Sequence, residues 1–161
     1  MNGILTPRRV AKPIRLSLAE DLGGEIDGSW WPHSSMIAAE LPDLVGGLHN
    51  KLGEIVDIRI NWSPSDGQYE LGSVATGVRL NRTNGPHRRP RLMVVVGQVA
   101  SAKLLVIPSM TSQALGAIVM RMVAGLPTWS GSGDADLFAT AQVVIGVAKA
   151  ELVRWPGAAS Q

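Results

Sequence analysis

The sequence contains no cysteine among its 161 residues. A disulfide framework, a cysteine-based zinc site and a thiol nucleophile are therefore excluded. The same absence suits a reducing compartment, so we expect a cytoplasmic protein. The opening stretch, residues 1–9, has no apolar run after a basic start, and we expect no signal peptide there.

Aromatic residues and net charge are also scarce. Aromatic residues make up 4% of the chain, and 15 Lys and Arg against 13 Asp and Glu leave a net charge of only +2. A charge this small does not by itself imply a nucleic-acid partner. Hydrophobic residues make up 45% and charged residues 17%, which is typical of an ordered globular chain with a core of its own.

Motifs for cofactors, metals and nucleophiles are missing. Gly131-Ser-Gly133 lacks the third glycine of a dinucleotide loop, and no phosphate loop occurs. The three histidines, His33, His49 and His87, do not have metal-ligand spacing. No serine lies in a nucleophile elbow. The sequence therefore predicts no cofactor and no metal, and it favours a protein that is not an enzyme.

Alternating apolar and polar residues predict six strands. They lie at residues 14–20, 25–31, 55–62, 73–80, 92–99 and 103–107. In the third of these, Val56, Ile58, Ile60 and Trp62 form a uniformly apolar set, and we expect that face to be buried. Short connections between successive strands favour an antiparallel sheet of about five or six strands.

Apolar stripes at helical spacing predict three helices that pack on this sheet, giving an α+β fold. They lie at residues 35–52, 111–125 and 135–154. We expect Ser34 or Ser35 to cap the first helix and Ser109 or Thr111 to cap the second. Pro42 lies inside the first helix and predicts a kink or a break there.

The chain is expected to form one α+β domain, residues 14–156, between a flexible arm at 1–13 and a flexible tail at 157–161. The longest apolar stretch, from residue 137 towards residue 153, is interrupted by polar residues and has helical period. A membrane span needs about 20 mainly apolar residues, so this stretch is interpreted as a core helix.

The hexapeptide Asp27-Gly-Ser-Trp-Trp-Pro32 has two interpretations. As a site, Trp30 or Trp31 forms an apolar wall, and Asp27 or His33 supplies polar chemistry. As structure, one tryptophan fills the core, the other half-covers a sheet edge, and Asp27 with the following glycine forms a turn. Tryptophan buries roughly 200 Å² or more, so the structural interpretation is favoured. The candidate ligand-binding residues are Asp27, Trp30, Trp31, His33, Arg59 and Trp62.

Two further clusters of charge stand out. Asp57 and Arg59 are expected to pair with strand neighbours on the surface of the sheet, where an ion pair adds little stability. The alternative is an exposed sheet face that binds a ligand through Arg59 and Asn61. A basic loop is the candidate for phosphate contacts, but it lacks the aromatic residues that stack on bases, so a solvated hairpin tip is favoured. The loop arginines are Arg82, Arg88, Arg89 and Arg91.

The order of several short motifs resembles an uncharacterised actinobacterial family, a domain of unknown function with an Asp-Gly-x-Trp-Trp-Pro signature. The motifs are Asp27-Gly-Ser-Trp-Trp-Pro32, Glu40-Leu41-Pro42, a strand ending at Trp62, Val78-Arg79-Leu80 and Leu104-Leu-Val-Ile-Pro108. The resemblance runs from about Leu16 to about Ala124. It implies a small cytoplasmic domain, and it implies no established activity and no catalytic residues.

We expect a non-catalytic binding or regulatory module that acts through the surface around Trp30, Trp31 and Arg59. One alternative is a nucleic-acid-associated protein that uses the basic loop. A second alternative is a small enzyme with Asp27 or His33 as acid or base. The expected partner is a protein or a small ligand, and no membrane. The sequence does not determine the oligomeric state, although an uncovered sheet edge could pair.

Overall fold

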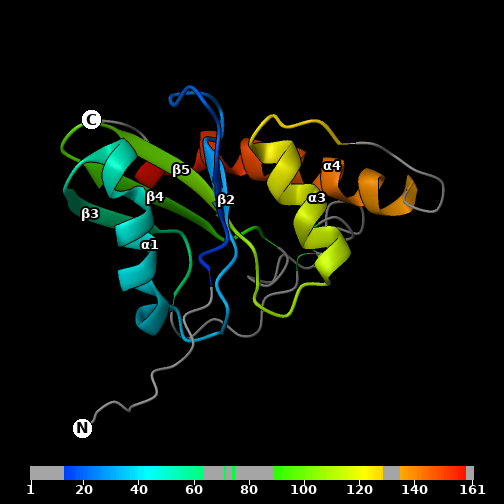
Figure 1. Ribbon diagram of the computed structural model, residues 1–161. Coiled ribbons are helices and arrows are strands. Elements are labelled where there is room, and N and C mark those ends of the chain that lie inside the picture. The colour runs from blue at the N-terminus through cyan, green and yellow to red at the C-terminus, as the bar shows by residue number, and fades with distance from the viewer. Residues whose placement is uncertain (1–12, 64–70, 72–73, 75–88, 129–134, 159–161) are drawn as a thin grey trace, which may run out of the picture.

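The computed structural model describes residues 13–63, 71, 74, 89–128 and 135–158. Within these residues five strands form one sheet in the order β1-β2-β5-β4-β3 (Figure 1). The strands are β1 (Leu16–Leu18), β2 (Gly28–Trp30), β3 (Ile55–Ile60), β4 (Leu92–Gly97) and β5 (Ser101–Val106). The helices with defined bounds are α1 (Ile37–Leu52), α3 (Gln113–Val123), α4 (Ala135–Arg154) and the short 3₁₀ helix η3 (Pro156–Ala158).

The sheet is mixed, so the predicted α+β class is confirmed and the predicted antiparallel sheet only in part. Strand β1 pairs antiparallel with β2, and β3, β4 and β5 form an antiparallel meander. The chain then places β5 parallel to β2, with Ser29 opposite Leu105. A sixth strand is not found in the described residues. Val74, the one described residue of the strand predicted at 73–80, is helical.

Helices cover both faces of the sheet, and each face has its own core (Figure 1). On one face, Leu44 and Leu48 of α1 pack with Met93 of β4 in one cluster of buried residues. On the other face, α3 and α4 pack in a second cluster that contains Leu92 of β4. Neighbouring residues of β4 therefore belong to different cores, because successive side chains of a strand point to opposite faces.

Strand β3 corrects one prediction. Its apolar set is not buried: Val56 is 59% exposed and Ile60 is 39% exposed. The register shifts between Ile55 and Asp57, so Val56 lies at a bulge. Ile55 and Ile58 consequently both pack against the core beneath α1. Simple alternation along β3 fails because a bulge adds one residue to the strand.

The beginning of α1 also differs from the prediction. Neither Ser34 nor Ser35 caps the helix, whose N-cap residue is Met36 and makes no side-chain cap bond. Instead Glu40, in the first turn, accepts the backbone N–H of His33 at 3.2 Å and the hydroxyl of Ser34 at 2.8 Å. This carboxylate fixes the segment between β2 and α1.

The structure corrects the predicted break at Pro42 and the predicted cap of the second helix, and it confirms the bounds of the third helix. Helix α1 runs through Pro42 without a break. Ser112, rather than Ser109 or Thr111, caps α3 by accepting the backbone N–H of Leu115 at 3.2 Å. The bounds of α4 agree with the predicted residues 135–154. Across the described part of the chain, no helix combines the length and the apolar character that a bilayer crossing requires.

Candidate functional site

The two adjacent tryptophans belong to different cores. Trp30 is 1% exposed and packs with α1, whereas Trp31 is 3% exposed and packs with α3 and α4. The alternation of side chains along β2 and into the next residue produces this division. The expectation that one tryptophan half-covers a sheet edge is therefore wrong, since both are buried. Neither tryptophan lines the two cavities described below.

Trp31 is held between a cation and a helix. The guanidinium of Arg15 lies 3.9 Å from the centre of the indole ring. Arg15 also donates to the backbone oxygens of Trp31 and Pro32 at 3.1 and 3.0 Å. Burial lowers the pKa of Arg15, and the nearby Glu40 opposes that shift. An arginine pKa begins so high that the side chain remains charged, and the stacking contact is a cation–π contact.

Asp27 is a buried acceptor with three backbone partners. Its carboxylate accepts the N–H groups of Gly23 at 2.7 Å and Gly24 at 3.2 Å through Oδ1. Its Oδ2 accepts the N–H of Lys103 at 2.8 Å. These bonds join the connection between β1 and β2 to strand β5. Charge-assisted bonds of this kind are stronger than neutral ones, so Asp27 fixes the position of that connection.

A groove of about 610 Å³ lies on the face of the sheet that α1 does not cover. Val94 and Val96 of β4 and Ser101 and Lys103 of β5 form part of its lining. Their neighbours Met93, Val95 and Ala102 pack on the α1 side, which places the groove on the opposite face. The β1–β2 connection, with Asp27, lies along one side of the groove, and Arg59 of β3 lies along the other.

Two cations and one carboxylate line this groove. Arg59 pairs with Asp57 of the same strand at 3.0 Å and donates to the backbone oxygen of Gly157 at 3.1 Å. Within the described residues no carboxylate forms an ion pair with the ammonium of Lys103. Both oxygens of Asp27 accept backbone N–H groups. The groove therefore presents cationic groups above an apolar floor, and that arrangement is suited to an anion.

The structure brings Asp27 and Arg59 to one groove and leaves the other candidates elsewhere. His33 follows the opposite end of β2 from Asp27, and its Nε2 lies 2.8 Å from the backbone oxygen of Pro13. Asp27 lines the groove and His33 lines neither cavity described here, so the structure does not bring the two residues to one cavity. Trp62 packs at the edge of the core beneath α1.

Asn61 has a structural role at the end of β3. Its side-chain oxygen accepts the N–H of Leu92 at 2.7 Å, and its side-chain nitrogen donates to the backbone oxygen of Pro90 at 3.0 Å. The amide thus extends the pairing of β3 with β4 by one position. Because both ends of the amide are used in this way, we do not include Asn61 among the groove residues.

The described part of the basic loop contacts the protein itself. Arg89 lies 3.9 Å from the carboxylate of Glu151, which also pairs with Arg154 at 3.1 Å. The guanidinium of Arg91 lies 5.6 Å from the ring centre of Trp62. The other two candidate arginines, 82 and 88, lie outside the described residues.

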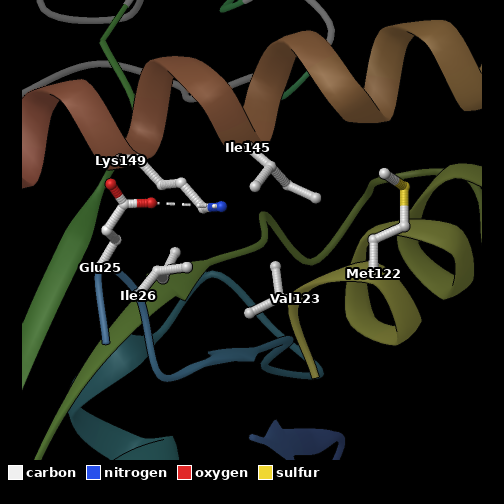
Figure 2. A pocket seen from close by; sticks show the side chains of 6 residues that line it. All are labelled: Glu25, Ile26, Met122, Val123, Ile145 and Lys149. Carbon is white, nitrogen blue, oxygen red and sulfur yellow. Dashed lines mark ion pairs between the residues drawn. The ribbon is translucent and has the colours of Figure 1, made fainter. Parts of the chain in front are cut away.

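A second, smaller cavity lies between α3, α4 and the β1–β2 connection (Figure 2). Its volume is about 120 Å³. Figure 2 shows Glu25 and Lys149 at one side, where their charged atoms are 3.6 Å apart, and the apolar side chains of Ile26, Val123 and Ile145 beside them. The cavity holds a few water molecules at most. Among the described residues no group of His, Cys, Asp or Glu has the arrangement of a metal site.

Sequence reasoning missed Ser101 and Lys103. The predicted strand began at Lys103, so Ser101 was placed before it, whereas β5 runs from Ser101 to Val106. The sequence did contain a pattern that indicates a strand from Ser101 onward, because polar Ser101 and Lys103 alternate with apolar Ala102 and Leu104. That pattern is typical of a strand with one buried and one open face at its beginning.

Comparison with known protein families gives a match. A family model described as a family of unknown function, DUF5994, matches residues 15–123, from the beginning of β1 to the end of α3. The matched segment includes the described residues that form the groove floor. No curated protein matches the chain, and no solved structure matches it. The actinobacterial origin and the Asp-Gly-x-Trp-Trp-Pro signature remain predictions from the resemblance.

Proposed function

We propose that this chain, which belongs to the family of unknown function DUF5994, is a non-catalytic binding module of the cytoplasm. Its site is the groove on the open face of the sheet. Its ligand is a small molecule with an anionic head and an apolar body. The observation that carries the proposal is the position of Lys103, a residue that lines an apolar-floored groove and forms no ion pair within the described structure.

The shape and chemistry of the groove support this ligand class. A volume of about 610 Å³ is within the range of small-molecule sites, which combine an apolar lining with a few polar groups. Val94 and Val96 supply apolar surface, while Lys103 and Arg59 supply positive charge. An anionic head beside Lys103 gains a charge-assisted hydrogen bond, and an apolar body covers the part of Val96 that remains exposed.

The groove supports binding rather than catalysis. Asp27 has the only carboxylate among the described lining residues, and its oxygens already accept three backbone N–H groups. A general base needs a lone pair directed at the proton that it removes. Asp27 has instead a geometry that fixes the wall of the groove. The absence of cysteine supports the cytoplasmic part of the proposal.

Isothermal titration with octanoate and with 1-octanol tests the proposal, because the two molecules share an apolar chain and differ in charge. We expect octanoate to bind and 1-octanol to bind more weakly. Lys103→Ala should weaken octanoate binding about tenfold, the usual size of one charge-assisted hydrogen bond. The matched control is Lys51→Ala, which removes an exposed lysine from α1 on the other face of the sheet.

Two results would overturn the proposal. The first is no octanoate binding by the folded protein at millimolar concentration. The second is an equal loss of affinity in Lys103→Ala and Lys51→Ala, which would show a non-specific response to net charge.

A further inference from the structure

Strand β3 lies at an edge of the sheet in the described structure, where it pairs with β4 alone. The N–H of Asn61 donates to the backbone oxygen of Leu92 at 3.2 Å. Bonding positions alternate along an antiparallel pair, so Asp57 and Arg59 also direct their backbone groups towards β4. Ile58 and Ile60 direct theirs away from the sheet. The outer side of β3 therefore offers backbone donors and acceptors to another strand.

The residues of β3 are complementary to themselves when the strand is reversed. An antiparallel pair of two β3 strands, centred on Ile58, places Asp57 of each copy opposite Arg59 of the other. The outward backbone groups of Ile58 make this central position a hydrogen-bonded pair. The positions on either side are then non-hydrogen-bonded pairs, whose Cα atoms lie about 4.5 Å apart and whose side chains are closest. Opposite charges thus meet at the two closest positions.

We propose that β3 is an interface at which a second copy of this chain adds its own β3 antiparallel, giving a symmetric dimer with one continuous sheet. The two cross-strand pairs between Asp57 and Arg59 set the register. The same register places exposed Val56 of one copy opposite exposed Ile60 of the other. The bulge at Val56 limits the regular ladder, so the ion pairs beside Ile58 select this register over its neighbours.

The ion pair that Arg59 makes with Asp57 in its own chain is compatible with this dimer. Arg59 and Asp57 lie on the same face of β3, where they form the 3.0 Å ion pair. In the dimer, two carboxylates and two guanidinium groups form one alternating cluster on that face. The two-fold axis is perpendicular to the sheet, so both grooves open on the same side of the dimer. The inference does not depend on whether the groove binds a ligand.

Two charge-reversal variants, measured separately and then mixed, test the interface. Arg59→Asp gives a β3 with two acids, and Asp57→Arg gives a β3 with two arginines. In a dimer of either variant with itself, the proposed register places like charges opposite each other. Sedimentation equilibrium should show a dimer for the unmodified chain at up to about 0.5 mM, since a short edge-strand interface is small and weak. Each single variant should self-associate about tenfold more weakly, because like charges then meet opposite each other.

An equimolar mixture of the two variants should restore the dimer, because each acidic β3 then meets a basic β3. The double variant carrying both substitutions should dimerise alone. If Asp57 and Arg59 interact only within one chain, mixing should not restore the dimer, because each chain still carries two like charges. Circular dichroism checks that every variant is folded.

Three outcomes would overturn the inference. They are a monomeric unmodified chain over the whole concentration range, dimers in both single variants, and no restoration on mixing. A monomer would show that the charges of β3 protect the edge against pairing. Lys103→Ala is the control that separates this inference from the proposed function. It should leave the dimer intact while weakening octanoate binding.

Discussion

At the scale of single residues, the buried carboxylate of Asp27 joins the segment between β1 and β2 to strand β5. It is 1% exposed and accepts three backbone N–H groups. A carboxylate accepts at both oxygens, whereas an amide presents an NH₂ group on one side. The charge and shape of Asp27 therefore both matter for the wall of the groove.

Asp27→Asn should lower the free energy of unfolding by about 1–3 kcal/mol, because the amide nitrogen would face a backbone N–H and leave it unpaired. Urea unfolding followed by circular dichroism measures this change. The control is Asp43→Asn, at an exposed position of α1, which should change stability by less than about 0.5 kcal/mol. Equal effects at the two positions would contradict a structural role for the Asp27 carboxylate.

Gly116 is the second residue on which packing depends. A side-chain carbon at this position of α3 would overlap the ring of Trp31. Gly116→Ala should therefore destabilise the protein by about 1–3 kcal/mol, despite the higher helix propensity of alanine. Gly146→Ala in α4, where nothing lies within 4 Å, should instead stabilise by about 0.5–1 kcal/mol. Thermal unfolding of both variants gives the comparison, and stabilisation by both would contradict the packing described for Trp31.

The strand predicted from the sequence was enough to place the two tryptophans on opposite faces of the sheet. A strand was expected over residues 25–31, and alternation along it places Trp30 and Trp31 on opposite faces. Burial of both residues then required helices on both faces of the sheet. The sequence did not show which face of the sheet each helix covers, because the placement of α1, α3 and α4 depends on the order of the strands.

At the scale of secondary-structure elements, α1 is continuous although Pro42 lies in its interior. Proline has no N–H for the carbonyl of Ala38, one turn earlier. That carbonyl belongs to the first turn of the helix, where Ala38 is exposed and water reaches it. An expected break did not occur because three apolar residues further along, Leu44, Leu48 and Leu52, hold the helix on the sheet.

Pro42→Ala should raise the free energy of unfolding by about 1 kcal/mol. Alanine restores one helical hydrogen bond, and the greater freedom of the unfolded chain offsets part of the gain. The control is Pro156→Ala at the first position of η3, where proline is well tolerated and the change should be small. Chemical unfolding measures both. A loss of stability in Pro42→Ala would show that the helix depends on its proline.

Strand β3 shows where sequence patterns lose information. Its apolar residues predicted a buried face, but the bulge at Val56 and the edge position of the strand leave Val56 and Ile60 exposed. Period-two patterns assume a regular strand with neighbours on both sides. Neither condition holds for β3. The polar set was interpreted more accurately, since Asp57 and Arg59 lie together on one face of the strand and form an ion pair there.

At the scale of the whole molecule, one mixed sheet separates two cores, and the described residues leave one part of one face open. Five of the six predicted strands and all three predicted helices are present in the described residues, with shifted ends. The parallel pairing of β2 with β5 could not be predicted, because it joins segments about 75 residues apart in the sequence. Only that pairing brings Asp27 beside Lys103.

The groove consequently could be predicted only in part. Asp27 and Arg59 were candidates from sequence, but their common groove depends on the strand order β2-β5-β4-β3. Lys103 was overlooked because an isolated lysine at the predicted beginning of a strand is an ordinary surface residue. Tertiary structure places it in the lining of the groove, since α3 and α4 cover other parts of that face.

The most direct test of the groove as the binding site is an amide chemical-shift titration of the ¹⁵N-labelled protein with octanoate. Binding in the groove predicts saturable shifts at Val94, Val96, Ser101 and Lys103, and unchanged signals at Leu44 and Leu48 of α1. Saturable shifts centred on α1 or on the described arginines 89 and 91, with the groove strands unchanged, would contradict the account.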